Sequence, residues 1–175
     1  MTDHAPIETT NLDRYGSPPL EWARAQDAIA SGAPSMEAAF FLCTVGDDGA
    51  PHAAAFGAAW LAGDLYFTSG PRTRKSKNLA ARPQATIAAR LTGIDLALDG
   101  RAERVTDETT LRAVAAQYND GGWPCEVDGD AFTAPYSAPS AGPPPWYLYR
   151  FTFHTVTAVA TAEPHGATRW RFAAG

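Results

Sequence analysis

The sequence predicts a mainly β protein, a six- to seven-stranded antiparallel split β-barrel with attached helices. Several strand-like segments occur along the 175 residues, and short turns join most of them. Some of these segments alternate between apolar and polar side chains, which is typical of a sheet with two unlike faces. Most neighbouring strands have no helix between them, which favours an antiparallel sheet over a parallel one.

Length and composition indicate one globular domain with a substantial core, since 45% of the 175 residues are hydrophobic. The net charge of −5 argues against general nucleic-acid binding, which usually needs a basic surface. No apolar run approaches the roughly 20 residues of a membrane span, and the first residues do not resemble a signal peptide. We therefore expect a cytoplasmic protein that binds neither nucleic acid nor membrane. Cys43 and Cys125 are too few for a disulfide framework.

The first 35 residues predict an arm and a helix. Residues 1–18 are polar and end in a Ser-Pro-Pro sequence, so we expect a flexible N-terminal arm before a domain of residues 19–175. Apolar residues from Leu20 to Ile29 recur at roughly helical spacing and predict the first helix. A Ser-Gly-Ala-Pro sequence then ends this helix.

The next segment predicts an antiparallel meander. Strand-forming residues are concentrated in 40–45, and Gly46-Asp47-Asp48-Gly49 is a hairpin signal. The returning strand is expected at 52–61, and a turn at 62–64 leads to a third strand at 65–68. Three consecutive strands joined by short turns form such a meander.

The second half of the chain predicts further strands around one helix and one long loop. Asp107 lies at a helix cap, which predicts a helix over 110–118. Residues 119–145 are rich in Pro and Gly and predict an irregular loop, and loops of this length are often functional. Strands are expected at residues 84–91, 94–105, 146–161 and 168–172.

The most informative stretch lies between the third strand and Pro83. A Ser-Gly-Pro break follows the strand, and Arg72, Arg74, Lys75 and Lys77 then fall within six residues at the start of a predicted helix. Cations at a helix start oppose the helix dipole unless an anion is bound there. The stretch therefore favours a phosphate site, because the helix N-terminus and the cations attract the same ligand. A solvated basic helix is the alternative.

The order of these motifs resembles the pyridoxamine 5′-phosphate oxidase-like, flavin-binding split-barrel family. The resemblance rests on an Asp-Gly-x-Pro hairpin at 48–51, an aromatic–aromatic–Thr strand end, the Thr-Arg-Lys sequence and a Pro-initiated strand after Pro83. It covers residues 36–105 well and 146–172 loosely. The family implies an FMN cofactor and a homodimer that holds the cofactor at the subunit interface.

The resemblance assigns cofactor-binding residues by position. Thr73, Arg74 and Lys75 match the element that grips the flavin phosphate, and Arg72 and Lys77 are close enough to assist. The strand residues Tyr66, Phe67 and Thr68 match the strand beside the isoalloxazine ring. The closing pair Trp170 and Arg171 is similar to the ending that reaches the cofactor or substrate, with an edge strand of solvent-facing arginines as the alternative.

The chain also departs from the family pattern. The authentic oxidases place an Arg on the second strand, where this sequence reads His52-Ala53-Ala54-Ala55-Phe56. Small residues there, continuing through Gly57 and Ala59, would let a flat ring lie close to the backbone. Relatives of the same fold bind the deazaflavin coenzyme F-420, which is also a phosphorylated tricycle.

The expected function is a flavin-dependent oxidoreductase that transfers hydride to or from a small organic substrate. A deazaflavin-dependent reductase is one alternative, and a non-enzymatic flavin, deazaflavin or haem carrier or sensor is another. His52, His154 and His165 show no metal-ligand spacing, so no metal site is expected and no catalytic residue is identified. The loop from Trp123 to Trp146 is a candidate substrate wall or dimer contact, or it covers the core.

Overall fold

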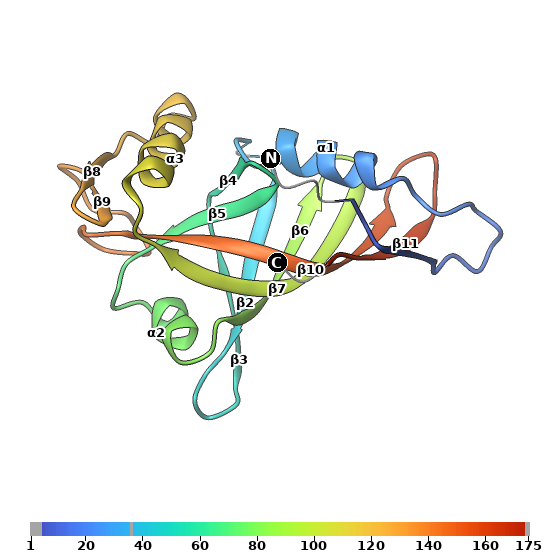
Figure 1. Ribbon diagram of the computed structural model, residues 1–175, viewed down its shortest axis with the longest axis horizontal. Coiled ribbons are helices and arrows are strands. Elements are labelled where there is room, and N and C mark those ends of the chain that lie inside the picture. Colours follow the sequence, from blue (N-terminus) through green and yellow to red (C-terminus); the bar gives the residue numbers. More distant parts are fainter. Residues whose placement is uncertain (1–4, 36, 174–175) are drawn as a thin grey trace.

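The computed structural model describes residues 5–35 and 37–173, and it confirms the mainly β, antiparallel fold class (Figure 1). Three helices accompany the strands in this part of the chain. The helices are α1 (Trp22–Gly32), α2 (Arg74–Ala81) and α3 (Glu108–Asp120). The strands are β1 (Glu8–Asn11), β2 (Ala39–Val45), β3 (Pro51–Ala55), β4 (Ala58–Leu61), β5 (Asp64–Ser69), β6 (Gln84–Leu91), β7 (Ile94–Val105), β8 (Glu126–Asp128), β9 (Ala131–Thr133), β10 (Tyr147–Ala160) and β11 (Ala167–Arg171).

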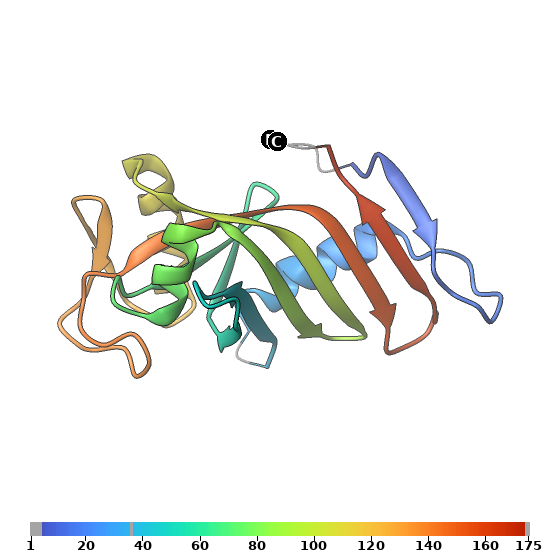
Figure 2. The same cartoon turned by 90° about the horizontal axis from the view of Figure 1, so that it is seen from below.

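The barrel is split because the long strand β10 changes its partner. On one side β10 pairs with β7 along nearly its whole length, from Leu148 to Ala160. On the other side its first residues pair with β5, and residues from Thr155 onward pair with β11. The strands β4, β5, β10, β7, β6, β2 and β3 follow one another round the barrel, while β11 and β1 continue the sheet outward (Figure 2).

A β-bulge marks the point where β10 changes partner. The register against β7 shifts between Phe153 and Thr155, and the His154 carbonyl oxygen accepts a hydrogen bond of 2.9 Å from the Phe172 N–H. Gly100 of β7 pairs with Phe153, and a Cβ atom at Gly100 would overlap the Thr152 carbonyl oxygen and lie 2.8 Å from the Phe153 Cα. The close approach of β7 and β10 at this bend therefore requires glycine.

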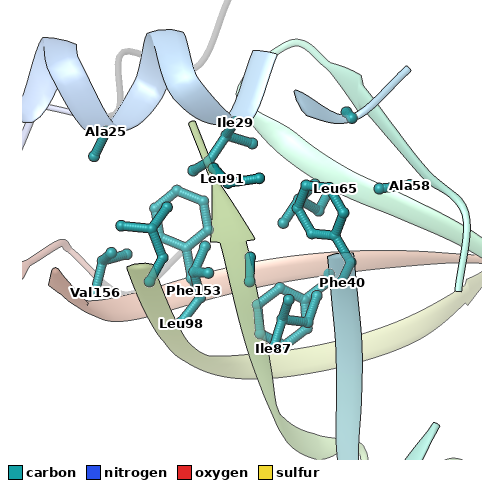
Figure 3. Close-up of a cluster of buried hydrophobic side chains, with 14 of the residues drawn as sticks. Ala25, Ile29, Phe40, Ala58, Leu65, Ile87, Leu91, Leu98, Phe153 and Val156 are labelled. Carbon is teal, nitrogen blue, oxygen red and sulfur yellow. The ribbon is translucent and has the colours of Figure 1, made fainter. Parts of the chain in front are cut away.

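The core lies between the barrel and α1. The helix buries Trp22, Ala25 and Ile29, and Figure 3 shows Ala25 and Ile29 pointing toward Phe153 and the barrel side chains around it. A second cluster packs α3 against the segment after it and the start of β10. Its fully buried members are Leu111, Val114, Phe132, Trp146 and Leu148.

The structure differs from the sequence-based expectations at three places. Residues 8–11 of the predicted flexible arm form β1, which pairs with β11 in the register Glu8 to Arg171. Backbone hydrogen bonds hold this strand, and its polar sequence gives no alternating pattern; residues 1–4 of the arm lie outside the described residues. The strand expected at 52–61 is two strands, separated at Phe56 and Gly57. The loop of residues 119–145 contains the β8–β9 hairpin.

None of the helices in the described ranges is long and apolar enough to cross a membrane.

Replacing Gly100 with Ala should lower the free energy of unfolding by about 1–3 kcal/mol, because the added methyl group forces β7 and β10 apart at the bulge. Chemical denaturation of the purified variant measures this change. The matched control is Gly57→Ala, where a Cβ atom would meet no heavy atom within 4 Å. Equal stability of the two variants would contradict the role of Gly100 in closing the barrel.

Candidate functional site

A cavity of about 860 Å³ lies beside the barrel, and residues from all three helices contribute to its wall. Most of the lining residues are small or aromatic. They are Ala30, Ala33, Pro34, Ser35, Phe40, Ala55, Phe56, Gly57, Ala58, Ala59, Trp60, Thr68, Lys75, Gln117, Tyr118, Asp120, Gly121, Trp123, Ala138, Ser140 and Ala141. A cavity of this volume is large enough for a cofactor or a drug-sized ligand.

The floor of the cavity is the bend between β3 and β4. Every residue from Ala55 to Trp60 contributes to the wall, and the space where a side chain at Gly57 would lie is open. Two side chains of α3 fix this bend: the Tyr118 hydroxyl donates to the Gly57 carbonyl at 3.1 Å, and the Gln117 amide donates to the Trp60 carbonyl at 3.2 Å. A flat ligand can therefore approach a rigid stretch of backbone.

A chain of hydroxyl groups fixes the turn from β5 into α2. Ser76 donates to Ser69 at 2.8 Å, and the hydroxyl groups of Ser69 and Thr73 lie 2.7 Å apart. Thr73 in turn donates to the Gly70 carbonyl at 2.9 Å and, as the N-cap of α2, accepts from the Ser76 N–H at 3.3 Å. Thr73, which the family resemblance assigned to the phosphate-binding element, thus uses its hydroxyl group to cap the helix.

The helix α2 is docked on the β2–β3 hairpin. Its buried Asn78 donates to the Thr44 hydroxyl at 2.9 Å, and Arg82 donates to the Gly46 carbonyl at 2.8 Å. These contacts fix the direction of the helix, so that its first turn adjoins the cavity. The backbone N–H groups of Arg74 and Lys75 lie in the first turn of α2, where no carbonyl of the helix itself can accept from them. No other group of the described residues accepts a hydrogen bond from either N–H.

Lys75 is the cation that the structure brings into the cavity. Its residue is only 8% exposed, and burial lowers the pKa of its ammonium group. Within the described residues, neither Lys75 nor the neighbouring Arg72, Arg74 and Lys77 forms an ion pair with a carboxylate. A buried ammonium group without an anion is unfavourable, which is the state expected of a site that receives an anionic ligand.

The other cations of this stretch lie at the surface beside Lys75. Arg72, Arg74 and Lys77 are all exposed at the start of α2. The guanidinium group of Arg74 lies close to the β2–β3 turn, 3.7 Å from the position of a Cβ atom at Gly46. The structure therefore brings these four cations together around one helix N-terminus.

The family resemblance placed Tyr66, Phe67 and Thr68 of β5 beside the flavin ring. Of these three residues, only Thr68 lies in the cavity wall. Phe67 is fully buried and stacks on Tyr149 with ring centroids 5.2 Å apart, and Tyr66 is buried in the second core cluster. Both faces of β5 are covered in this fold, which the short sequence alternation does not reveal. Phe67 contacts the lining residue Phe56, with ring centroids 5.1 Å apart.

Trp170 and Arg171 do not lie at this cavity. Trp170 is 1% exposed and packs edge-on against Trp22, with ring centroids 5.4 Å apart. Arg171 is exposed, and its guanidinium group lies 3.4 Å from a Glu8 carboxylate oxygen. The reason is topological: β11 pairs with the second half of β10, whereas β5 and the cavity lie beside the first half.

The loop after α3 contributes part of the cavity wall and also covers the second core cluster, against which Trp123 and Tyr136 pack. Trp123, Ala138, Ser140 and Ala141 line the cavity. A Cβ atom at Gly70 would lie 2.6 Å from the Ala141 carbonyl oxygen, so this glycine lets the loop approach the β5–α2 turn. The contributions of Trp60 and of the C-terminal ends of α1 and α3 were not predicted, because no local motif marks them.

Few titratable groups line the cavity. Among the described lining residues they are Lys75, Tyr118 and Asp120, and burial raises the pKa of the Tyr118 hydroxyl. Burial also raises the pKa of the nearby Cys125 thiol to about 11, so this thiol is neutral at pH 7. The described residues contain no group of three or more side chains placed to hold a metal ion. The arrangement suits binding and orientation of a ligand more than acid–base catalysis.

Comparisons with known proteins agree with this fold. A conserved hypothetical protein from Mycobacterium tuberculosis superposes with a TM-score of 0.61 at 17% identity, covering 85% of this chain and 89% of its own. A pyridoxamine 5′-phosphate oxidase-related, FMN-binding protein from Nostoc punctiforme superposes with a TM-score of 0.56 at 17% identity, covering 86% of this chain and 91% of its own. A NimC/NimA family protein from Clostridium acetobutylicum superposes with a TM-score of 0.55 at 16% identity, covering 83% of this chain and 91% of its own.

No curated protein matches the sequence significantly. The family model described as pyridoxamine 5′-phosphate oxidase matches residues 32–159, from the end of α1 through nearly all of β10. Because this match spans well over half of the chain, the protein belongs to the pyridoxamine 5′-phosphate oxidase family.

Proposed function

We propose that the protein is a flavin-dependent oxidoreductase that binds FMN in this cavity and acts on a small organic substrate. The observation that carries the proposal is the buried ammonium group of Lys75, which lines the cavity beside a helix N-terminus without an ion-pair partner in the described residues. When bound, the flavin supplies hydride transfer at its ring. The protein binds the phosphate, orients the ring and excludes water.

The start of α2 fits a phosphate group. Lys75 and Arg74 provide positive charge, and the free N–H groups of the same two residues provide donors directed along the helix axis. Charge-assisted hydrogen bonds of this kind are about twice as strong as neutral ones. The internal bonds of Ser69, Thr73 and Ser76 keep this turn in one conformation before the ligand arrives.

The remainder of the cavity fits a planar ring. The small residues of the β3–β4 bend leave space beside the backbone, and Phe56 and Trp60 supply apolar surface on the same bend. The relative from Nostoc punctiforme is an FMN-binding protein, which supports the same ligand here. Coenzyme F-420 has the same combination of tricycle and phosphate and is the alternative cofactor.

A haem cofactor fits the cavity less well. A solved structure of a heme binding protein from Mycobacterium smegmatis shares the fold, with a TM-score of 0.53 at 18% identity. Haem iron is usually held by His, Cys, Met or Tyr. The described lining residues include only Tyr118 from this set, and its hydroxyl group already donates to the Gly57 carbonyl. The residues therefore favour a flavin or deazaflavin.

The proposal includes a homodimer with the cofactor at the interface. The outer faces of β2 and β3 carry an exposed apolar patch, in which Phe41 pairs with Ala55 and Val45 with Pro51. Phe41 and Val45 are each 44% exposed, and Ala55 also lines the cavity. A second copy bound on this patch would cover apolar side chains and adjoin the cavity. The cytoplasmic location likewise remains a prediction.

The double variant Arg74→Ala/Lys75→Ala should lose about 2–4 kcal/mol of FMN binding free energy, since it removes two charge-assisted contacts. Fluorescence titration of the flavin measures the dissociation constant. The control Arg101→Ala/Arg112→Ala removes the same charge from exposed ion pairs with Glu103 and Glu108 and should leave FMN binding nearly unchanged. Equal losses of FMN affinity in both double variants would show that the effect comes from net charge and not from contacts at the start of α2.

Replacing Lys75 with Met should raise the thermal midpoint of the cofactor-free protein while weakening FMN binding. Burial lowers the pKa of Lys75, so the unfolded chain binds this proton more tightly than the folded protein does. At any pH below the lowered pKa, the charged Lys75 therefore decreases the free energy of unfolding. In the wild type this cost disappears as the pH rises through that pKa toward 10.5. The control Lys77→Met changes an exposed cation of the same helix and should leave stability within about 0.5 kcal/mol. A destabilised Lys75→Met variant would contradict the unpaired state of this ammonium group.

The absorbance spectrum and steady-state turnover test the oxidoreductase activity. The protein reconstituted with FMN should show flavin bands and consume NAD(P)H in the presence of an acceptor; reduced coenzyme F-420 is assayed in parallel. Tight FMN binding with no turnover for any donor and acceptor pair would favour a carrier or sensor instead.

A further inference from the structure

Lysine is rare in this chain, and one of its two lysines lies in the cavity. Of the 14 Lys and Arg residues, only Lys75 and Lys77 are lysines. Both belong to α2 and lie two residues apart, but Lys77 is exposed, whereas Lys75 is 8% exposed and lines the cavity. Lys75 is the only primary amine among the described lining residues, and Lys77 is its solvent-facing counterpart on the same helix.

The amine of Lys75 can react in a way that a guanidinium group cannot. An arginine side chain stays protonated in proteins, whereas a buried lysine can lose its proton and then act as a nucleophile. The exposed neighbours Arg72 and Arg74 already supply permanent positive charge at the start of α2. Attraction of an anion therefore does not by itself require a lysine at this position.

The surroundings of Lys75 favour its neutral form. Burial lowers the pKa of the ammonium group, and no carboxylate of the described residues pairs with it. The N-terminal end of α2 carries a partial positive charge, which also opposes protonation of a side chain in the first turn. Desolvation in an apolar pocket is one of the ways in which proteins activate a lysine as a nucleophile.

The cavity that Lys75 lines fits a planar molecule. Its volume is about 860 Å³, and Phe40, Phe56 and Trp60 contribute rings to its wall. The rings of Phe40 and Phe56 lie 5.9 Å apart between centroids, and the Trp60 ring stacks on Phe153 with an interplanar angle of 10°. These contacts hold the rings in place, so an aromatic molecule can bind against fixed apolar surfaces in the same cavity as the amine.

We propose that Lys75 is a nucleophilic amine that captures aromatic aldehydes as imines in the cavity of the cofactor-free protein. The inference goes beyond the proposed function, and the two compete for one residue, because Lys75 also belongs to the proposed phosphate site. A bound phosphate stabilises the ammonium form of Lys75, and the ammonium form has no lone pair to react. The aldehyde and FMN therefore exclude each other.

The reaction is a condensation and needs no further reactant. The lone pair of the Lys75 nitrogen attacks the carbonyl carbon, and the carbonyl oxygen takes up a proton to give a carbinolamine. Loss of water then forms the C=N bond. Both protons of the neutral amine leave with the carbonyl oxygen, so one amine and one aldehyde give one imine and one water. No atom is oxidised or reduced, and addition of water reverses the reaction.

Reductive labelling of the cofactor-free protein tests the proposal. The probe 2-naphthaldehyde is added with sodium cyanoborohydride, which reduces an imine to a stable secondary amine, and peptide mass spectrometry measures the label on each lysine. Labelling of Lys75 should saturate with aldehyde concentration. At low concentration it should exceed that of Lys77 at least about tenfold, because binding in the cavity holds the aldehyde near the amine. Equal labelling of the two lysines, or no saturation at Lys75, would overturn the proposal.

A probe without a ring tests the aromatic class. Propionaldehyde carries the same reactive group but has no planar surface to bind against the cavity wall. Its labelling of Lys75 should rise in proportion to concentration without saturating. Saturation at the same concentration as with 2-naphthaldehyde would overturn the selection of aromatic aldehydes.

Two variants locate the reaction. Lys75→Arg keeps the positive charge and removes the amine, so the saturable labelling should be lost. Gly57→Leu leaves the amine in place and fills the floor of the cavity, where a Cβ atom meets no heavy atom within 4 Å. It should reduce the labelling of Lys75 to the level of Lys77. The control Ala80→Leu adds the same side chain to an exposed position of α2 outside the cavity and should leave the labelling unchanged. Saturable labelling of Lys75 in Gly57→Leu would overturn the role of the cavity.

Competition with FMN separates the two proposals. FMN at 100 times its dissociation constant should slow the labelling of Lys75 about 100-fold, because it occupies the shared site. FMN binding without any saturable labelling overturns the imine and leaves the proposed cofactor site intact. Saturable labelling in a protein that does not bind FMN supports the imine and rejects the proposed cofactor. FMN binding that leaves the labelling unchanged would overturn the shared site.

Discussion

The change of partner along β10 is the constraint on which the rest of the structure depends. One strand pairs with β7 along nearly its whole length, with β5 in its first half and with β11 in its second half, and Gly100 permits the bend between the halves. The first half fixes β5, and β5 leads directly into the hydroxyl-bonded turn and α2. The second half pairs with β11, and both halves contribute side chains to the core: Tyr149 and Phe151 from the first half, and Val156 and Ala158 from the second. The bulge thus separates the part of β10 that pairs with β5, next to the site, from the part that pairs with β11.

The site combines a rigid frame with one unfavourable charge. The hydroxyl chain from Ser76 to Thr73, the Asn78–Thr44 bond and the Tyr118–Gly57 bond leave the turn and the floor of the cavity little freedom. Within this frame the ammonium group of Lys75 is desolvated without a compensating carboxylate in the described residues. Such a group lowers the stability of the free protein and raises its affinity for an anion, which is a common compromise at binding sites.

The fold class and the basic start of α2 could be predicted because their signals are local. Alternation, hairpin turns and a cation cluster at a helix start lie within a few residues of one another in the sequence. Other features depend on distant pairings: β1 is held by backbone bonds to β11, and Trp170 is directed into the core by the second half of β10. The contribution of the α1 and α3 ends to the wall of one cavity also depends on the complete fold, which no single segment encodes.

The central claim is that the cations at the start of α2 hold the phosphate of a planar redox cofactor. Comparing FMN with riboflavin tests it most directly, since the two molecules share the ring and differ in the phosphate. The account predicts that FMN binds the wild-type protein on the order of 100-fold more tightly than riboflavin, from about two charge-assisted contacts. Equal dissociation constants for the two flavins would contradict it.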